Sequence, residues 1–214
     1  MSSMIDIAVF TCAAYAHLIP KWLRFFERTF PLPYHLDYIV AGTDTITVPT
    51  DYHQNVTRFT AVKDNGFAAN MLTWLRGRDD PVMMLMDDHM LFEADAALLA
   101  QAWDIIHRTD VGCVRLVPWP GPTLPYDVPG FGEIDKSLEY AISLQASMWK
   151  PQTLRDLIDP AWNPWEIELR GSAYASAYYS VKFIGCKSCA VNYKDYMLRG
   201  RPRPEHAAWV DANI

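Results

Sequence analysis

Several features that would place a protein in a membrane or outside the cell are missing from this chain of 214 residues. No apolar run approaches the roughly 20 residues that are needed to span a bilayer. The N-terminus has no basic start, long apolar block or small-residue cleavage site, so it does not resemble a secretory signal. Internal repeats and low-complexity tracts are missing too. We therefore expect a soluble, cytoplasmic protein that forms one domain over residues 1–214.

Cysteine is scarce, because four cysteines in a domain of this size do not make a disulfide framework. Cys186 and Cys189 form a lone C-x-x-C, which could be half of a zinc site or a redox pair. No second C-x-x-C or nearby histidine pair completes a zinc site, and the setting is not thioredoxin-like. We therefore favour structural or incidental cysteines, since free cysteine is often simply buried.

The net charge of −6 is unevenly spread along the chain. The segment from Arg170 to Arg203 holds seven basic residues and one acid, which gives it +6 and leaves −12 on the remainder. A basic segment of this kind can bind an anionic ligand, such as a pyrophosphate or a nucleic-acid backbone. It can equally be a solvated surface that balances an acidic half, and the sequence leaves both readings open.

Hydrophobic periodicity in the first half of the chain alternates between strands and helices. Residues 51–62 are ambiguous, either a strand or an irregular connection. This order is typical of an α/β fold, a mostly parallel sheet flanked by helices that cross over between its strands. Strands are expected at residues 5–11, 38–41, 82–86 and 111–117, and helices at 18–30, 67–76 and 94–106.

The second half begins with a loop at residues 118–132 that is rich in proline and glycine. Long loops in compact domains are usually functional lids or disordered. The aromatic residues Trp119, Tyr126 and Phe131 could cover a ligand or anchor this loop to the core. Beyond it we expect strands at 140–149, 181–184 and 190–193, a helix at 151–158 and a short segment at 166–169.

The apolar run from Val82 to Met86 leads directly into Asp87, Asp88 and His89. Such a run is typical of a strand buried on both faces, and open α/β sheets bind their ligands at the carboxyl ends of strands. Clustered carboxylates suit a divalent cation, and an adjacent histidine favours manganese over calcium. In an extended stretch, Asp87 and His89 would point to one side and Asp88 to the other. The alternative is an acid cluster that is solvated or salt-bridged without metal.

Three further segments follow the Met86–His89 element in the chain. They are SLQASMW at 143–149, PWEIE at 164–168 with Gly171 and Ser172, and YKD at 193–195 with Arg199 and Gly200. In this order the elements resemble GT-A glycosyltransferases, in particular a group of small bacterial and phage-type glycosyltransferase-like proteins. The likeness runs from Ile5 to about Arg203, nearly the whole chain.

The resemblance implies a GT-A-like fold in which residues 1–117 bind a nucleotide-sugar and residues 118–214 bind the acceptor. It implies Mn²⁺ or Mg²⁺ as cofactor, held by Asp88 and His89, with Asp87 contacting the ribose or the donor sugar. His206 is the candidate for a late histidine ligand, or else an ordinary exposed histidine. The residues implied along the nucleobase and nucleoside are Thr11, Cys12, Ala13, Asn65, Gly66 and Asn70.

An inverting transferase also needs a base that takes the proton of the acceptor hydroxyl. The resemblance implies Glu166 near the base position, with Glu168 in reserve. If the segment starts a helix, the two side chains are about 200° apart and only one faces the site. Either glutamate could instead simply favour a helix N-terminus. The acceptor side would include Trp119, Gln145, Trp149 and Trp165.

The sequence therefore predicts a metal-dependent, inverting glycosyltransferase that uses a UDP-sugar and a hydroxyl acceptor. One acceptor is a hydroxymethyl pyrimidine in phage DNA, which would place the protein in the host cytoplasm, and the basic segment would contact its phosphates. Another is a glycan intermediate of surface-polysaccharide assembly. A metal-dependent phosphoesterase and a non-catalytic module that binds nucleotide-sugar or nucleic acid are the alternatives from other classes.

Overall fold

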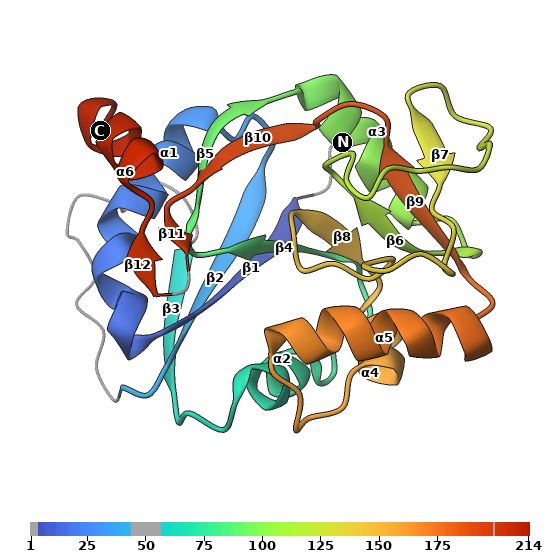
Figure 1. Cartoon of the computed structure of the whole chain (residues 1–214), viewed down its shortest axis with the longest axis horizontal. Coiled ribbons are helices and arrows are strands. Elements are labelled where there is room, and N and C mark those ends of the chain that lie inside the picture. Colours follow the sequence, from blue (N-terminus) through green and yellow to red (C-terminus); the bar gives the residue numbers. More distant parts are fainter. Residues whose placement is uncertain (1–3, 44–56, 199) are drawn as a thin grey trace.

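An eight-stranded sheet forms the centre of the computed structural model, with strand order β3-β2-β1-β4-β8-β6-β9-β7 (Figure 1). The structure describes residues 4–43, 57–198 and 200–214. The first four strands of this order are parallel: β1 (Ile5–Cys12), β2 (Tyr34–Ala41), β3 (Thr57–Val62) and β4 (Val82–Met86). The predicted α/β class is confirmed. Of the ambiguous stretch, residues 57–62 form β3, and residues 51–56 lie outside the described part.

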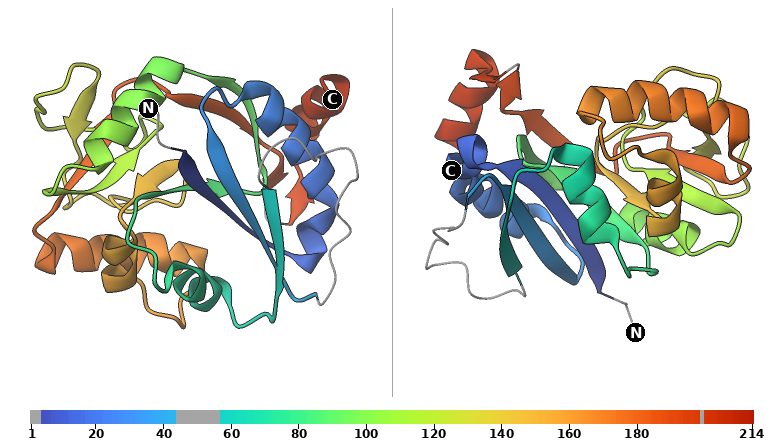
Figure 2. Two further views of the ribbon diagram at one scale, coloured as in Figure 1. Left: turned by 180° about the vertical axis from the view of Figure 1, so that it is seen from behind. Right: turned by 90° about the horizontal axis from the view of Figure 1, so that it is seen from below.

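Helices cover both faces of the sheet (Figure 2). Successive side chains of a strand point to opposite faces, and those of β1 accordingly alternate between two hydrophobic cores. Ile7 and Val9 pack with α1 (Ile19–Thr29) and α3 (Ala96–Ile106), and η1 (Ala13–Leu18) leads into α1. Ala8 and Phe10 pack on the other face with α2 (Phe67–Leu75), α4 (Pro151–Leu157) and α5 (Pro164–Tyr178). The three helices predicted in the first half are confirmed.

The second half of the sheet mixes strand directions. β8 (Ser147–Trp149) lies antiparallel between β4 and β6 (Val111–Arg115), and β9 (Lys182–Cys186) runs parallel to β6. β7 (Phe131–Glu133) pairs antiparallel with β9 at the edge. The strand predicted at 140–149 is wrong for residues 140–146, which have no regular structure.

Several backbone groups of the irregular residues 140–146 find their hydrogen-bond partners in side chains from outside the segment. Arg115 Nη2 donates to the carbonyls of Tyr140 and Ala141 at 2.8 and 2.7 Å. Ser172 Oγ accepts the amide of Ile142 at 2.9 Å. Because these partners come from β6 and α5, the segment is held between the sheet and that helix.

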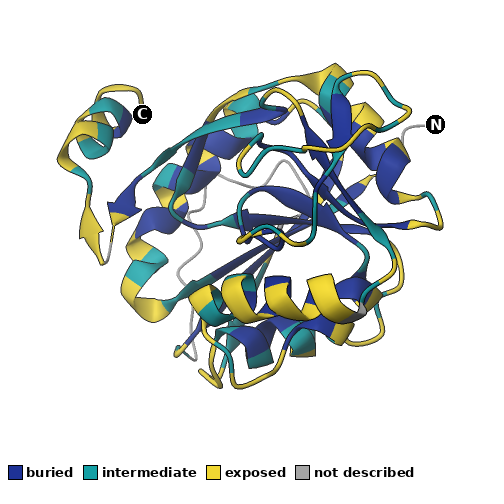
Figure 3. Ribbon diagram, turned by 45° about the vertical axis from the view of Figure 1, so that its right-hand side comes forward, coloured by how far each residue is buried: buried dark blue, intermediate teal, exposed yellow. Residues whose placement is uncertain are grey.

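The segment predicted at 166–169 is the beginning of a much longer helix, α5. Asn163 accepts the amide of Glu166 and Glu166 accepts the amide of Asn163, a reciprocal capping box that fixes the first turn. Pro164 occupies the first helical position, which favours helix initiation. One face of α5 is exposed along its length (Figure 3).

A second sheet begins where β4 ends. Asp87 and Asp88 form a turn, after which β5 (His89–Ala94) pairs antiparallel with β10 (Val191–Asp195). A short hairpin of β11 (Met197–Leu198) and β12 (Arg201–Pro202) leads to α6 (Pro204–Ala212). In the described residues, no helix has the length and apolarity that a membrane span requires.

The loop at 118–132 is anchored to the core by two of its three aromatic residues. Phe131 is fully buried, and Tyr126 packs against the core and accepts a hydrogen bond from Arg108 at 2.9 Å. Trp119, in contrast, is 51% exposed. Of these three aromatic residues, only Trp119 is therefore exposed enough to contact a ligand.

Candidate functional site

The acidic turn at Asp87 and Asp88 lies at the carboxyl end of β4, in the middle of the sheet. The expectation that this stretch is extended is wrong, because Asp87 and Asp88 form a turn between β4 and β5. Asp87 is buried and accepts a short hydrogen bond from the hydroxyl of Thr11 on β1. The carbonyl of Asp88 accepts the amide of Tyr196 at 2.7 Å, which ties the turn to the end of β10.

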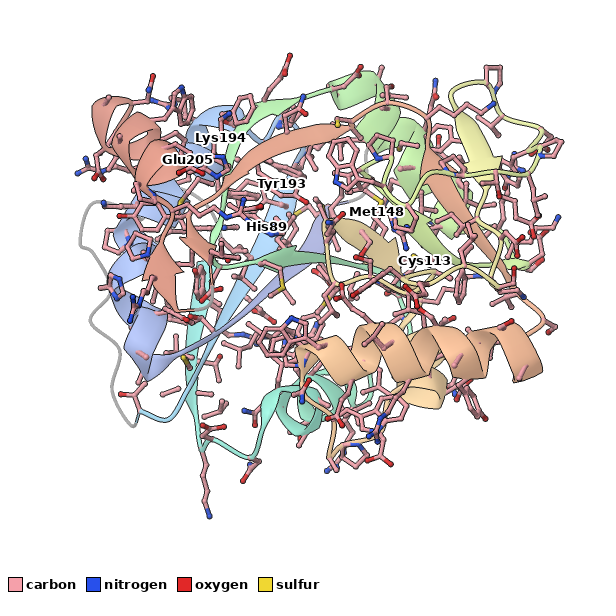
Figure 4. The ribbon with its side chains drawn as sticks, viewed as in Figure 1. His89, Cys113, Met148, Tyr193, Lys194 and Glu205 are labelled. Carbon is pink, nitrogen blue, oxygen red and sulfur yellow. The ribbon has the colours of Figure 1, made fainter. Side chains whose placement is uncertain are left out.

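Asp88 and His89 lie close to a third residue, Asp195, that was not among the predicted site residues. The antiparallel register of β5 and β10 pairs His89 with Asp195. His89 Nε2 lies 3.8 Å from Asp88 Oδ1 and 3.5 Å from Asp195 Oδ1. The imidazole stacks on Tyr193 with centroids 3.9 Å apart, and the two residues are neighbours in Figure 4. Its buried Nδ1 has no hydrogen-bond partner among the described residues.

Burial shifts the pKa values of Asp87, Asp88 and His89 in the direction that favours the neutral form of each side chain. It raises the pKa of Asp87 to about 6. It raises the pKa of Asp88 to about 7, with smaller effects from the charges of Asp87 and Asp195. It lowers the pKa of His89 to about 4, so the imidazole is neutral near pH 7 and has a nitrogen lone pair to offer. A bound cation would relieve the cost of ionising these acids.

The donor set fits a divalent cation that shares its coordination with a ligand. In the parts of the chain that the structure describes, no three His, Cys, Asp or Glu side chains are arranged to hold a metal on their own. Mg²⁺ and similar ions are commonly bound through one or two carboxylates together with substrate phosphates and water. Asp88 and Asp195 can supply such a partial site, with neutral His89 beside them.

His206 lies on α6, next to the same cluster. Its Nδ1 is 2.8 Å from the carbonyl of Asp195. Arg203 Nη2 lies 3.6 Å from Asp195 Oδ2 and partly balances its charge. The structure therefore brings His206 to the edge of the acidic cluster through the backbone of Asp195.

An apolar cavity of about 250 Å³ lies beside the turn, at the carboxyl ends of β1 and β2. Phe67 and the buried Asn70 enter it from the first turns of α2. Of the residues predicted along the nucleoside, Thr11, Cys12 and Asn70 line the cavity. The other three do not line it and are only next in sequence to residues that do: Ala13, Asn65 and Gly66. The full lining is Phe10, Thr11, Cys12, Tyr15, Ile39, Ala41, Asp64, Phe67, Asn70, Met86, Asp87 and Pro164.

A second cavity, of about 360 Å³, continues from the first on the other side of the turn. The two cavities share Tyr15, Met86, Asp87 and Pro164, so together they form one groove. No lysine or arginine of the described residues lines either cavity. The second is lined by Tyr15, Met86, Asp87, Asp88, His89, Leu144, Gln145, Pro164, Trp165, Glu168, Met197 and Gly200.

The two candidate glutamates on α5 have different surroundings, as their helical spacing requires. Glu168 lines the second cavity, and its Oε1 accepts Ser143 Oγ–H at 3.0 Å and the amide of Leu144 at 2.8 Å. Glu166 does not line the cavity and is engaged in the capping box and in an ion pair with Arg170 at 3.0 Å. The structure brings Glu168 to the groove.

The residues predicted on the acceptor side divide in the same way. Gln145 and Trp165 line the second cavity, and the buried Oε1 of Gln145 has no hydrogen-bond partner within the part of the chain that the structure describes. Trp149 is 1% exposed and donates to Ser147 Oγ inside the core, so it is a core residue. Trp119 is exposed but does not line the groove.

The basic segment from Arg170 to Arg203 does not form one surface. Lys182 pairs with Asp110 at 2.9 Å, and Lys194 lies over the ring of Phe92 at 5.4 Å. Arg170 pairs with Glu166 and Arg203 lies near Asp195, while Arg199 lies outside the described residues. Because these positions are on different elements, the second reading of the charge, a dispersed solvated surface, fits better.

The lone C-x-x-C has the surroundings of structural cysteines. Cys186 lies buried on β9, and Cys189 is half-buried in the following connection; both are free thiols. Burial raises the pKa of Cys186 to about 12. A thiol with this pKa is a poor nucleophile and a poor metal ligand near pH 7.

Comparison with known proteins places the fold and no more. No family model matches the chain, and no curated protein resembles it in sequence. Solved structures do resemble it, and three of them serve as examples.

The mannosyltransferase PcManGT from Pyrobaculum calidifontis, in complex with GDP-Man and Mn²⁺, has a TM-score of 0.56 and 16% identity, over 97% of this chain and 60% of that one. S. aureus TarS 1-349 with UDP-GlcNAc has a TM-score of 0.59 and 13% identity, over 89% and 58%. A UDP-glucose pyrophosphorylase with UDP-glucose has a TM-score of 0.55 and 12% identity, over 98% of both chains.

The chain thus spans about three fifths of the length of the two transferases. These likenesses show a GT-A-like fold, which occurs in both glycosyltransferases and nucleotidyltransferases.

Proposed function

We propose that this protein is a metal-dependent glycosyltransferase that moves a sugar from a UDP-sugar to a hydroxyl acceptor. The observation that carries this proposal is the order of features along one groove. An apolar cavity that includes Asn70 is followed by the acidic turn and then by a single well-placed carboxylate, Glu168. The bound ligands of the similar structures, which are GDP-Man with Mn²⁺, UDP-GlcNAc and UDP-glucose, support it.

The apolar cavity suits the nucleoside of the donor. Phe67 offers an aromatic face, and the amide of Asn70 can both donate to and accept from the edge of a base. Asp87, oriented by Thr11, lies between the two cavities and can accept hydrogen bonds from ribose or sugar hydroxyls. The diphosphate and the sugar would then occupy the second cavity.

The charge of the groove supports a divalent cation as cofactor. The lining acids would repel a diphosphate, and no lysine or arginine of the described lining offsets them. Asp88 and Asp195 would hold Mn²⁺ or Mg²⁺, with His89 and His206 beside them. The ion would neutralise the charge that develops on the departing diphosphate. The lack of a lysine or arginine in the described lining also disfavours a nucleotidyltransferase, which must bind a triphosphate and a sugar phosphate together.

Glu168 would act as the base. As the acceptor oxygen attacks the anomeric carbon, the bond from that carbon to the diphosphate breaks and Glu168 takes the acceptor proton. The two hydrogen bonds to its Oε1 hold the carboxylate against the groove. One displacement of this kind inverts the anomeric configuration, which NMR of the product measures.

The experiment exchanges the two glutamates separately. We expect Glu168→Gln to lower the transfer rate by about 10²–10⁴-fold, the range for loss of a general base, without weakening UDP binding. Glu166→Gln is the matched control on the same helix and should retain most activity. Equal losses, or none, would contradict the role of Glu168, and UDP binding without any turnover in the wild type would favour a non-catalytic module.

A further inference from the structure

Trp165 is the most exposed of the large hydrophobic side chains, at 66%. Among the described residues it makes no ring stacking or cation–π contact. Trp22 and Trp149, in contrast, are buried and pack in the two cores. An indole that contributes so little to the core, yet lines the mouth of a cavity, is suited to a ligand.

Trp165 also has a fixed relation to the proposed base. Residues three apart on a helix lie on the same side, with Cβ atoms about 5–6 Å apart. Trp165 and Glu168 therefore form adjacent parts of one wall of the second cavity. Gln145 lines the same cavity and carries an amide that can bind hydroxyl groups. An acceptor ring that stacks on the indole of Trp165 would place its hydroxyl groups near Glu168 and Gln145.

The charge around this wall excludes one class of acceptor. Asp87, Asp88 and Glu168 line the second cavity, and no described lysine or arginine does. The metal ion would be taken up by the donor diphosphate, so the remaining acids would repel a phosphodiester acceptor, whereas a neutral, hydroxyl-rich ring with an apolar face would not be repelled. Aromatic faces combined with carboxylate and amide acceptors bind such a ring by its C–H face and its hydroxyls.

Two more exposed aromatic residues lie farther along the same edge. The segment 140–144 runs beside α5, since Leu144 bonds to Glu168 and Ile142 bonds to Ser172 one turn later. Tyr140, at the outer end of this segment, is 39% exposed. Arg115 binds the carbonyls of both Tyr140 and Pro120, which brings the exposed Trp119 to the same end.

We infer that the acceptor is a neutral carbohydrate chain whose terminal ring stacks on Trp165 beside Glu168, with further rings reaching toward Tyr140 and Trp119. The inference rests on the proposed function, and it names the acceptor class that the function leaves open. A hydroxymethylated DNA acceptor is the competing class, and it is tested alongside.

The experiment measures two rates for each variant with the UDP-sugar that the wild type accepts. One is the slow Mn²⁺-dependent hydrolysis of that donor without acceptor, and the other is transfer to neutral oligosaccharides of increasing length. We expect Trp165→Ala to raise the acceptor KM at least about tenfold at every length, a larger change than any it causes in donor hydrolysis. Trp165→Phe should recover most of the loss. Tyr174→Ala, an exposed aromatic residue on α5 outside the cavity, is the matched control.

Chain length separates the inner from the outer positions. Tyr140→Ala and Trp119→Ala should raise KM only for the longer acceptors. Donor hydrolysis without any transfer to oligosaccharides, transfer to a hydroxymethylated oligonucleotide instead, or an unchanged KM in Trp165→Ala would each overturn the inference alone. Absence of donor binding and hydrolysis in the wild type would overturn the proposed function and this inference with it.

Discussion

Replacing Asp88 by asparagine should stabilise the protein when no metal is bound. Burial raises the pKa of this carboxyl to about 7 in the folded protein, from an ordinary value of 3.8. The folded state therefore holds the proton more tightly than the unfolded chain does. This contribution to stability is complete below about pH 4 and is lost as the pH rises through about 7. At pH 8 the ionised carboxylate destabilises the fold.

The size of this destabilisation follows from the difference between the pKa of Asp88 in the folded protein and its pKa in the unfolded chain. At about 1.4 kcal/mol for each pH unit between them, an ionised Asp88 costs up to about 4 kcal/mol. The side chain is 26% exposed, and solvent screening should reduce this to about 2–4 kcal/mol. Asparagine cannot ionise, so Asp88→Asn should raise Tm at pH 8 by about 5–10 °C for a chain of this size.

Thermal unfolding between pH 4 and pH 8, with and without Mn²⁺, measures this directly. The difference between Asp88→Asn and wild type should shrink as the pH falls and vanish near pH 4. Mn²⁺ with UDP should raise Tm of the wild type and not that of the variant, because a ligand stabilises only the state that binds it. Asp79→Asn, at a side chain that is 94% exposed, is the control. A variant that is less stable than wild type at pH 8, or a difference independent of pH, would refute the reasoning.

Two further predictions concern Asp37 on β2 and Asn70 on α2. Asp37 accepts hydrogen bonds from Arg58, Trp74 and Arg78. Asp37→Asn should therefore lower the free energy of unfolding by about 1–3 kcal/mol, measured by urea titration. An unchanged urea midpoint would contradict the importance of this network. Asn70→Ala should raise the Kd for UDP by about tenfold with little change in Tm, measured by calorimetry, and equal affinity would remove Asn70 from the nucleoside site.

Much of the fold could be predicted because its strongest signals are local. The apolar run at 82–86 and the helical spacing at 67–75 each depend on one short segment, and both elements form there. Residues 140–146 were mispredicted because Arg115 and Ser172, distant in sequence, take up their backbone hydrogen bonds.

The site was less predictable because it is assembled across the chain. Asp195 joins Asp88 only through the register of β10 on β5, although it lies within the YKD segment that carried the resemblance. The turn at Asp87 changes which side chains share a face, and periodicity cannot show it. The choice between Glu166 and Glu168 needed the capping box at Asn163, which occupies Glu166.

The most direct test of the account is calorimetric titration of the wild-type protein with UDP in the presence and absence of Mn²⁺. The acidic groove, without a described lysine or arginine in its lining, predicts binding that requires the metal and is lost in Asp88→Asn. Binding of UDP that is equally tight with a chelator present would contradict a metal-held diphosphate at the Asp87–Asp88 turn.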